Sequence, residues 1–572
     1  MPVLMERRLK WSRWLLLLAF FAVVWHLYGI QVSRGAALAA RARQMDVEEA
    51  PLEEYVRGQI NDRHGIPLTA PYTANGVVVF PQLMDDVKHD STVLARMLGL
   101  SPDALTKKAM DGAYRLTAPL KTAQLAALQQ ANLPGVFLLP ILHRYGAAPL
   151  AAHLTGNLGK IDSARQLEQL QGASGKIYDL GDWVGKSGLE YFYEAQLKGQ
   201  QSKEVAYLDR DARGRLIYGQ GLTVETAGSD PARRNVVTTI DQPVQQVVEE
   251  VMDTWVDTGA VVVMQVGTGD ILAMASRPGF NPDPSHMEGA VAATTAGNVF
   301  LDRDIALYQP GSIFKVVLAA AALETGTVDV KTKFHCDGIK AEPIHCWNEQ
   351  GHGDITFRDA FIRSCNPSFV QVGEMLGADK IIAYAKKLGL ADQTIIGYPV
   401  KPAAGQDLTQ IGQAFNLANS SIGQGPVLVT PVQLAAMINT IASDGIYYTP
   451  RLVTGLSNEQ NKMQEKITGP APRRALQSET AARLRELMCL TVTEGTGQKA
   501  AVPVWGSAGK TGSAEVVTGG GKTVNAWFTG YVPAAKPRYV IVVLTEQGRS
   551  GGETAAPVFQ TIAEKLMELT IK

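Results

Sequence analysis

Three short motifs in the C-terminal part of the chain carry side chains suited to acyl transfer. Ser312 and Lys315 lie three residues apart at the predicted start of a helix, which places both on one helix face. A lysine in a dry site can lose its proton and then act as the base that activates a serine hydroxyl. The motif is weak evidence alone, because an N-capping serine beside a surface lysine gives the same pattern. Ser507 and Lys510 repeat the spacing.

Two further motifs gain meaning from their order behind the first. Residues 364–367 read Ser-Cys-Asn-Pro, which is also ordinary helix-start chemistry, since asparagine caps helices and proline suits the first turn. Residues 510–513 read Lys-Thr-Gly-Ser in a strand-like segment, where glycine allows a ligand to approach the backbone. The alternative is a surface strand with a tolerated glycine. Together, Ser-x-x-Lys, Ser-x-Asn and Lys-Thr-Gly form the set typical of penicillin-binding proteins and class A β-lactamases.

A group of metal-binding side chains lies beside the middle motif. Cys336, Cys346, His352 and Cys365 fall within one short stretch, and only Cys489 lies outside it. Three thiols and one imidazole suit a closed tetrahedral zinc site, whose role would be structural. Two other histidines in this stretch directly adjoin cysteines, which makes joint chelation awkward. The alternatives are a disulfide between Cys336 and Cys346 or plain buried thiols.

The N-terminus contains an apolar stretch, residues 14–32, that is long enough to cross a bilayer as a helix. Four basic side chains precede it, at positions 7, 8, 10 and 13, and positive flanks stay in the cytoplasm. The sequence therefore predicts a cytoplasmic segment over residues 1–13, a single transmembrane helix over residues 14–32 and an extracytoplasmic remainder. A cleaved signal peptide is the alternative, but the apolar run is long for one and the small-residue cleavage site lies well beyond it.

The composition excludes two classes of protein. The 572 residues include 54 lysines and arginines against 55 acids, a net charge of −1, so no large basic surface for nucleic acid is expected. Four cysteines in this length rule out a disulfide-built scaffold. With 46% hydrophobic residues, the chain has ample apolar material to bury a core.

The order of predicted elements indicates an α+β fold for the C-terminal part. Residues 260–276 read as a hairpin, residues 314–489 are mainly helical, and further strands and a last helix close the chain. Strands at both ends with helices between them favour one antiparallel sheet flanked by helices. The texture changes near residue 236. Before it, residues 33–235 form a stalk, helical over residues 34–54, and a mixed region without a catalytic motif.

Four more segments resemble class B penicillin-binding proteins. Residues 57–65, RGQINDRHG, resemble the signature that follows the membrane anchor in that family. Residues 188–199, GLEYFYEAQLKG, resemble a second N-terminal signature. Residues 239–245 resemble the entry to the transpeptidase domain, and residues 421–433 are also typical of it. The chain is therefore identified as a member of this family, similar to penicillin-binding protein 2, over nearly all its length beyond the anchor.

The resemblance implies a serine-type D-Ala-D-Ala transpeptidase that crosslinks peptidoglycan stem peptides and is inhibited by β-lactams. It implies Ser312 as the acylated nucleophile, Lys315 as its base, Ser364 as the proton relay and Lys510 as the group that tunes the local field. Four further residues would bind substrate: Asn366, Thr511, Gly512 and Ser513. Ser513 stands where many members have threonine. No cofactor is implied for catalysis, and structural zinc is expected on the cysteine and histidine group.

The resemblance also implies an architecture and a cellular setting. An elongated mixed pedestal domain over residues 33–235 would precede a transpeptidase domain over residues 236–572 with a serine β-lactamase-like fold. The protein would sit in the bacterial cell membrane with its catalytic domain outside, acting in cell-wall synthesis for cell shape or division. A SEDS-type glycan polymerase in the membrane would be its partner, docked by the pedestal; the alternative is that the pedestal is a simple spacer.

Four other functions use or imitate the same motifs. A D,D-carboxypeptidase or a β-lactamase would transfer the acyl group to water. A β-lactam sensor would carry several membrane spans and a protease domain, which this sequence does not show. A non-catalytic cell-wall scaffold would not need intact Ser312, Lys315, Ser364 and Lys510. The membrane tether and the large N-terminal region favour wall synthesis.

Overall fold

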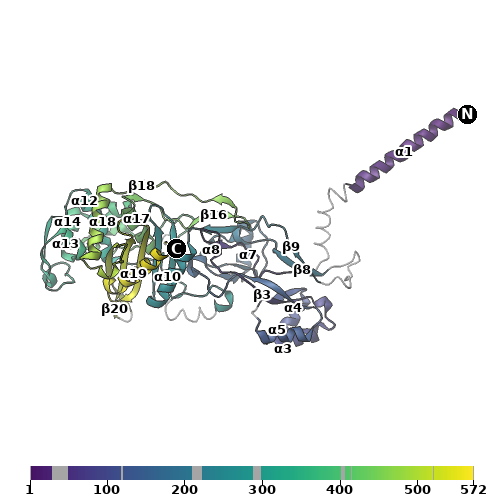
Figure 1. The fold of residues 1–572 in the computed structure, drawn as a ribbon, viewed down its shortest axis with the longest axis horizontal. Coiled ribbons are helices and arrows are strands. Elements are labelled where there is room, and N and C mark those ends of the chain that lie inside the picture. Colours follow the sequence, from purple (N-terminus) through teal and green to yellow (C-terminus); the bar gives the residue numbers. More distant parts are fainter. Residues whose placement is uncertain are drawn as a thin grey trace. The chain divides into compact units, whose positions relative to one another are not determined.

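The computed structural model describes residues 2–28, 49–117, 120–208, 222–287, 298–400, 406–413, 415–518 and 521–570 (Figure 1). These residues form two compact units that do not follow chain order. Unit 1 comprises Met1–Glu54, Thr73–His143 and Gln201–Ser229, and unit 2 comprises Tyr55–Tyr72, Arg144–Gln200 and Asp230–Lys572. Because the units group segments by packing, they do not test the predicted boundaries at residues 33 and 236, which stay predictions.

The N-terminal helix α1 spans Pro2–Tyr28. Among the described residues, none of the helices combines the length and the apolar composition that a bilayer crossing requires. The transmembrane helix predicted over residues 14–32 is therefore not confirmed and stays a prediction, and residues 29–32 lie outside the described residues.

In its described residues, unit 1 contains two small sheets and, besides α1, the three helices given below. One sheet has the order β1 (Glu49–Pro51), β8 (Glu204–Leu208), β9 (Leu222–Thr226), and the other has the order β4 (Tyr114–Leu116), β3 (Tyr72–Val79), β5 (Val136–His143). The helices are α3 (Val87–Leu98), α4 (Pro102–Met110) and α5 (Thr122–Ala131). The predicted stalk helix is wrong at its end, because Ala50 pairs with Ala206 in an antiparallel ladder instead of continuing a helix. The rest of that prediction, over residues 34–48, lies outside the described residues.

The main sheet of unit 2 is antiparallel, as predicted, and takes its strands from both ends of the C-terminal region. Its order is β12 (Ile271–Arg277), β11 (Gly259–Gln265), β21 (Tyr539–Gly548), β20 (Gly521–Val532), β19 (Ala508–Thr518). The predicted hairpin over residues 260–276 is confirmed, since β11 pairs with β12 around a short turn. β19 is the last strand in this order, so one side of its backbone is not used by the sheet.

Alternate residues of β11 face opposite sides of this sheet and enter separate cores. Val261 and Val263 pack in the core that contains α10 (Gln242–Trp255) and α19 (Ala556–Leu569). Val262 packs on the opposite side, in the core that contains α12 (Lys315–Glu324) and α17 (Pro431–Ala442). Both faces of the sheet are therefore covered by helices.

The stretch predicted to be mainly helical, residues 314–489, also contains short strand pairs. Its helices are α12, α13 (Phe357–Ile362), α14 (Asn366–Leu376), α15 (Ala378–Lys387), α16 (Asn416–Ser421), α17 and α18 (Ser478–Thr493). Its strands are β13 (Lys333–Cys336), β14 (Gly353–Thr356), β15 (Ile446–Tyr447), β16 (Val453–Ser457), β17 (Met463–Lys466) and β18 (Arg473–Arg474). The remaining elements of unit 2 are β2 (Ile60–Asn61), α6 (Ala152–Thr155), β6 (Leu158–Lys160), α7 (Ala164–Ser174), β7 (Trp183–Gly185), α8 (Gly188–Phe192), α9 (Glu194–Leu197) and β10 (Asn235–Thr238).

Candidate active site

Ser312 lies in a short turn, Gly311–Phe314, that leads directly into α12 beside the edge strand β19. Gly311 has a φ of 54°, and a Cβ added to it would lie 2.6 Å from the carbonyl oxygen of Ser513. Its N–H donates to the carbonyl of Gly423 at 3.0 Å. Only glycine accepts both this backbone conformation and this close contact, so Gly311 is what brings Ser312 against the strand.

Two lysine side chains converge on the hydroxyl of Ser364. The Nζ of Lys510 donates to Ser364 Oγ at 2.9 Å, and the Nζ of Lys315 lies 3.3 Å from the same oxygen. Lys315 also donates to the carbonyl of Ser364 at 2.7 Å. Both lysines are fully buried, Lys315 over the ring of Phe369 and Lys510 over the ring of Phe361. Lys510, Ser364 and Lys315 thus form one continuous chain of hydrogen bonds beneath the cleft.

Burial sets the protonation of these two lysines. Removal from water lowers the pKa of Lys315 to about 7, since an ammonium loses its hydration there. Burial, together with the adjacent Lys315, lowers the pKa of Lys510 well below its ordinary value. A lysine with a pKa near 7 is about half free amine at neutral pH, and this form can accept a proton.

Ser364 occupies a strained position between α13 and α14. Its φ of 56° lies in the left-handed region, which costs a residue with a side chain about 1–3 kcal/mol. The next residues are oriented by hydrogen bonds: Asn366 Oδ1 accepts from Lys315 Nζ at 2.7 Å, and its Nδ2 donates to the carbonyl of His345 at 3.2 Å. The Ser-x-Asn motif at residues 364–366 therefore forms a turn whose side chains point toward Lys315.

The edge strand supplies the opposite wall of a cleft of about 570 Å³. Thr511 Oγ1 lies 2.6 Å from Thr496 Oγ1, and Ser513 Oγ accepts from the N–H of Gly551 at 3.1 Å. A Cβ at Gly512 would lie 2.7 Å from a side-chain carbon of Ile313, so the strand passes closer to the Ser312 turn than an alanine would allow. The cleft is lined by predicted site residues Ser312, Ser364, Asn366, Thr511, Gly512 and Ser513, with Lys315 and Lys510 buried beneath.

The structure also separates the two Ser-x-x-Lys motifs. Ser507 is buried and donates to the carbonyl of Ala500 at 2.6 Å, away from the cleft lining. Sequence reasoning missed most of the other cleft residues, among them Trp347, Thr496 and Arg549. Trp347 directly follows Cys346, and its side chain is exposed although it is large and apolar. Nothing in the local pattern marked these residues, because long-range packing alone brings them to the cleft.

The predicted zinc ligands do come together. The potential ligand atoms of Cys336, Cys346, His352 and Cys365 all lie within 4.8 Å of one another. His352 Nδ1 lies 3.7 Å from Cys336 Sγ and 3.4 Å from Cys346 Sγ. The other two histidines point elsewhere, since His335 contacts the carboxylates of Asp354 and Asp337 and His345 contacts the carbonyl of Ala341. All four cysteines of the chain are free thiols in the structure.

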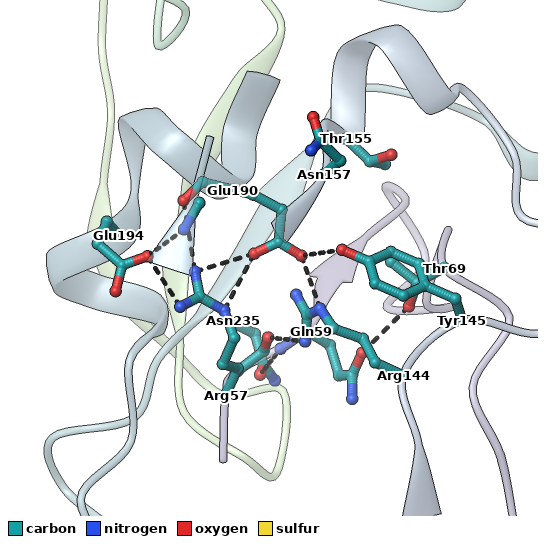
Figure 2. Close-up of polar contacts among 12 residues, drawn as sticks. Arg57, Gln59, Thr69, Arg144, Tyr145, Thr155, Asn157, Glu190, Glu194 and Asn235 are labelled. Atoms are coloured by element: carbon teal, nitrogen blue, oxygen red, sulfur yellow. Dashed lines mark hydrogen bonds and ion pairs between the residues drawn. The ribbon is translucent and has the colours of Figure 1, made fainter. Parts of the chain in front are cut away.

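The two N-terminal signatures meet in a buried ion network (Figure 2). Arg57, from residues 57–65, donates to Glu190 Oε2 at 2.9 and 3.1 Å, and its Nη1 lies 2.8 Å from Glu194 Oε2. Glu190, from residues 188–199, also accepts from Arg144 Nε at 2.6 Å and from the Tyr145 hydroxyl at 3.1 Å. In this network the first signature supplies the cation, Arg57, and the second supplies the anions, Glu190 and Glu194.

Comparisons with known proteins agree with this geometry. Residues 259–564 match the penicillin-binding protein transpeptidase domain, and residues 53–230 match the penicillin-binding protein dimerisation domain. The peptidoglycan D,D-transpeptidase PbpA of Mycolicibacterium smegmatis is 33% identical over 68% of this chain and 82% of its own length. The stage V sporulation protein D of Bacillus subtilis is 29% identical over 97% and 84%. The peptidoglycan D,D-transpeptidase MrdA of Acinetobacter baumannii is 27% identical over 88% and 80%.

A solved structure shows the same similarity in three dimensions. The D,D-transpeptidase domain of a peptidoglycan glycosyltransferase from Eggerthella lenta superposes with a TM-score of 0.53 and 25% identity, covering 64% of this chain and 95% of that domain. One activity agrees with the family matches, with the relatives and with the cleft: serine acyl transfer between peptidoglycan stem peptides. Enzymes with this activity bind β-lactams as inhibitors. The chain belongs to the penicillin-binding protein transpeptidase family and is a class B, penicillin-binding protein 2-like peptidoglycan D,D-transpeptidase.

Proposed function

We propose that Ser312 is the residue acylated in this D,D-transpeptidase and that Lys315 is its base. The convergence of the buried Lys315 and Lys510 on Ser364, beside the turn that bears Ser312, carries the proposal. Lys315 takes the hydroxyl proton as Ser312 Oγ bonds to the carbonyl carbon of the penultimate D-Ala. The C–N bond then breaks, and Ser364 passes a proton to the departing amine of the last D-Ala.

Two backbone groups would stabilise the oxyanion of this reaction. Gly311, which precedes Ser312, packs against the carbonyl of Ser513, and β19 is the last strand of its sheet, so the N–H groups of Ser312 and Ser513 would both lie near the reacting carbonyl. Each such donor contributes about 3 kcal/mol to the transition state. Asn366 would hold the donor peptide, and Thr511, Gly512 and Ser513 would hold its terminal carboxylate.

Labelling with penicillin tests the nucleophile. A labelled penicillin is expected to give a one-to-one adduct on the peptide that contains Ser312, and Ser312→Ala should abolish the adduct, as read by mass spectrometry. Ser507→Ala is the matched control, because it alters the other Ser-x-x-Lys motif and should keep the label. An adduct that persists in Ser312→Ala, or one that lies on Ser507, contradicts the assignment.

The second part of the proposal is a structural zinc ion. The donor set of three thiols and one imidazole fits Zn²⁺ with no open position. Cys336 and His352 come from the β13–β14 hairpin, whereas Cys365 directly follows Ser364. Metal bound by these residues would fix the hairpin to the strained turn and so hold Ser364 and Asn366 toward Ser312.

Metal analysis tests the zinc proposal. The purified protein is expected to contain about one zinc per chain, because the four ligands form a single closed site. Removal of zinc with a chelator should slow acylation by penicillin without altering Ser312, and Cys489→Ser is a matched control that should leave the zinc content unchanged. Absence of zinc together with a Cys336–Cys346 crosslink in mass spectra would instead establish the disulfide.

The third part concerns the cellular setting. Residues 14–32 would anchor the protein in the bacterial membrane with residues 1–13 in the cytoplasm, which the apolar stretch and its basic flank support. Residues 33–235 would form a pedestal that sets the reach of the transpeptidase domain, residues 236–572, and docks a SEDS-type polymerase. Protease added outside spheroplasts tests the topology, and cleavage only from the cytoplasmic side would contradict the predicted anchor. Co-purification of the polymerase with the protein tests the docking, and its absence would contradict the predicted partner.

A further inference from the structure

The cleft continues past Ser513 into a charged end. Four charged residues line that end: Lys499, Glu515, Arg549 and Glu553. Lys499 and Glu553 form an ion pair with each other at 3.2 Å. Neither Arg549 nor Glu515 forms an ion pair within 4 Å among the residues that the structure describes, and both are exposed to the cleft. One cation and one anion are therefore available to a ligand there.

Both available charges lie next to Ser513. Glu515 is two residues further along β19, so its side chain is on the same face as Ser513, about 7 Å away. Arg549 is two residues before Gly551, whose N–H donates to Ser513 Oγ. A Cβ on Gly551 would lie 2.4 Å from the carbonyl oxygen of Gly512, so this segment runs directly against the strand. The two charges thus flank the place where the terminal residue of the donor would sit.

The chemistry of the reaction connects that place to the second substrate. The group that leaves during acylation is D-Ala, an amine on a carbon that also bears a carboxylate. By microscopic reversibility, the acceptor amine attacks the ester from the side on which this amine departed. A subsite that complements the departing zwitterion therefore also complements an acceptor with the same arrangement of charges.

We propose that Arg549 and Glu515 form the acceptor subsite and select an amine whose carbon also carries a carboxylate, over an isolated primary amine. The proposal rests on the proposed acyl-enzyme at Ser312. The Arg549 guanidinium pairs with the acceptor carboxylate, and the Glu515 carboxylate receives the ammonium as it enters. The ammonium gives one proton to the Glu515 carboxylate, which releases it to solvent, and the resulting amine nitrogen bonds to the carbonyl carbon. The C–Oγ bond to Ser312 then breaks, and the second proton that the nitrogen loses passes through Ser364 and Lys315 to Oγ.

Matched acceptors test this inference on the full-length enzyme in detergent. An N-acyl-D-alanyl thioester serves as the donor, and D-alanine and D-alaninamide serve as acceptors that differ only in the carboxylate. In Arg549→Gln, the ratio of transfer to D-alanine over transfer to D-alaninamide should fall roughly tenfold relative to wild type. Amine basicity differs between the acceptors but is the same for every variant, so it cancels in this comparison.

Two further variants complete the test. Glu515→Gln should lower transfer to both acceptors by a similar factor, since both carry the amine. Lys499→Gln removes a cation from the same end of the cleft, but this cation is already paired with Glu553. The ratio of transfer to D-alanine over transfer to D-alaninamide should therefore stay at the wild-type value. An unchanged ratio in Arg549→Gln overturns the assignment of Arg549, and unchanged transfer in Glu515→Gln overturns that of Glu515. Failure of the acyl-enzyme proposal is distinct, because penicillin would then not label Ser312.

Discussion

Replacing Lys315 with alanine is expected to slow acylation of Ser312 by penicillin about 10²- to 10⁴-fold, the usual scale for loss of a general base. The Lys315 ammonium is buried and its pKa is lowered to about 7, mainly by that burial. Only the neutral amine can accept the serine proton. The wild-type acylation rate should therefore rise as the pH increases toward about 7 and level off above it.

A fluorescent penicillin measures both effects in one experiment, with rates taken between about pH 5.5 and 8.5. In Lys315→Ala the inflection near pH 7 should disappear along with the rate. Lys499→Ala is the matched control, since Lys499 is an exposed cation of the same cleft, paired with Glu553, and its loss should change neither rate nor profile. A Lys315→Ala enzyme that keeps the wild-type profile would show that another group is the base.

The site illustrates what residue patterns can and cannot predict. The types and order of Ser312, Lys315, Ser364 and Lys510 were sufficient to expect one site, because each motif falls at an element boundary that local sequence marks. The left-handed φ of Ser364 could not be expected, since serine rarely adopts it and only the surrounding packing enforces it. The two Ser-x-x-Lys motifs were likewise equivalent until burial distinguished them.

The fold shows the same division between local and long-range information. The β11–β12 hairpin follows from local periodicity and turn residues, and it lies where the sequence predicted it. The strand at residues 49–51 does not follow from its own sequence, because its partner β8 lies far along the chain. Arg144 also escaped notice, since it belongs to no motif and acquires its role only by contact with Glu190.

The largest expected effect on stability comes from that contact. Glu190→Ala is expected to lower the free energy of unfolding of unit 2 by about 3–5 kcal/mol, the usual cost of breaking a buried ion pair from one side. The variant leaves the buried guanidinium groups of Arg57 and Arg144 without their shared carboxylate. Urea unfolding followed by tryptophan fluorescence measures the change. Glu465→Ala is the matched control, because its pair with Arg234 is exposed and should contribute at most about 1 kcal/mol.

The pH dependence of unfolding separates the charge of Glu190 from its packing. Burial alone would raise its pKa, but Arg144 and Arg57 outweigh burial and the pKa is lowered below 4.5. The stability that ionised Glu190 contributes is therefore complete above about pH 4.5 and is lost as the pH falls through the lowered pKa of the folded state. Glu190→Gln keeps the shape but cannot ionise, so it should be less stable than wild type at neutral pH, and the difference should shrink in acid. A constant difference across this range would mean that packing, not charge, joins the two N-terminal signatures.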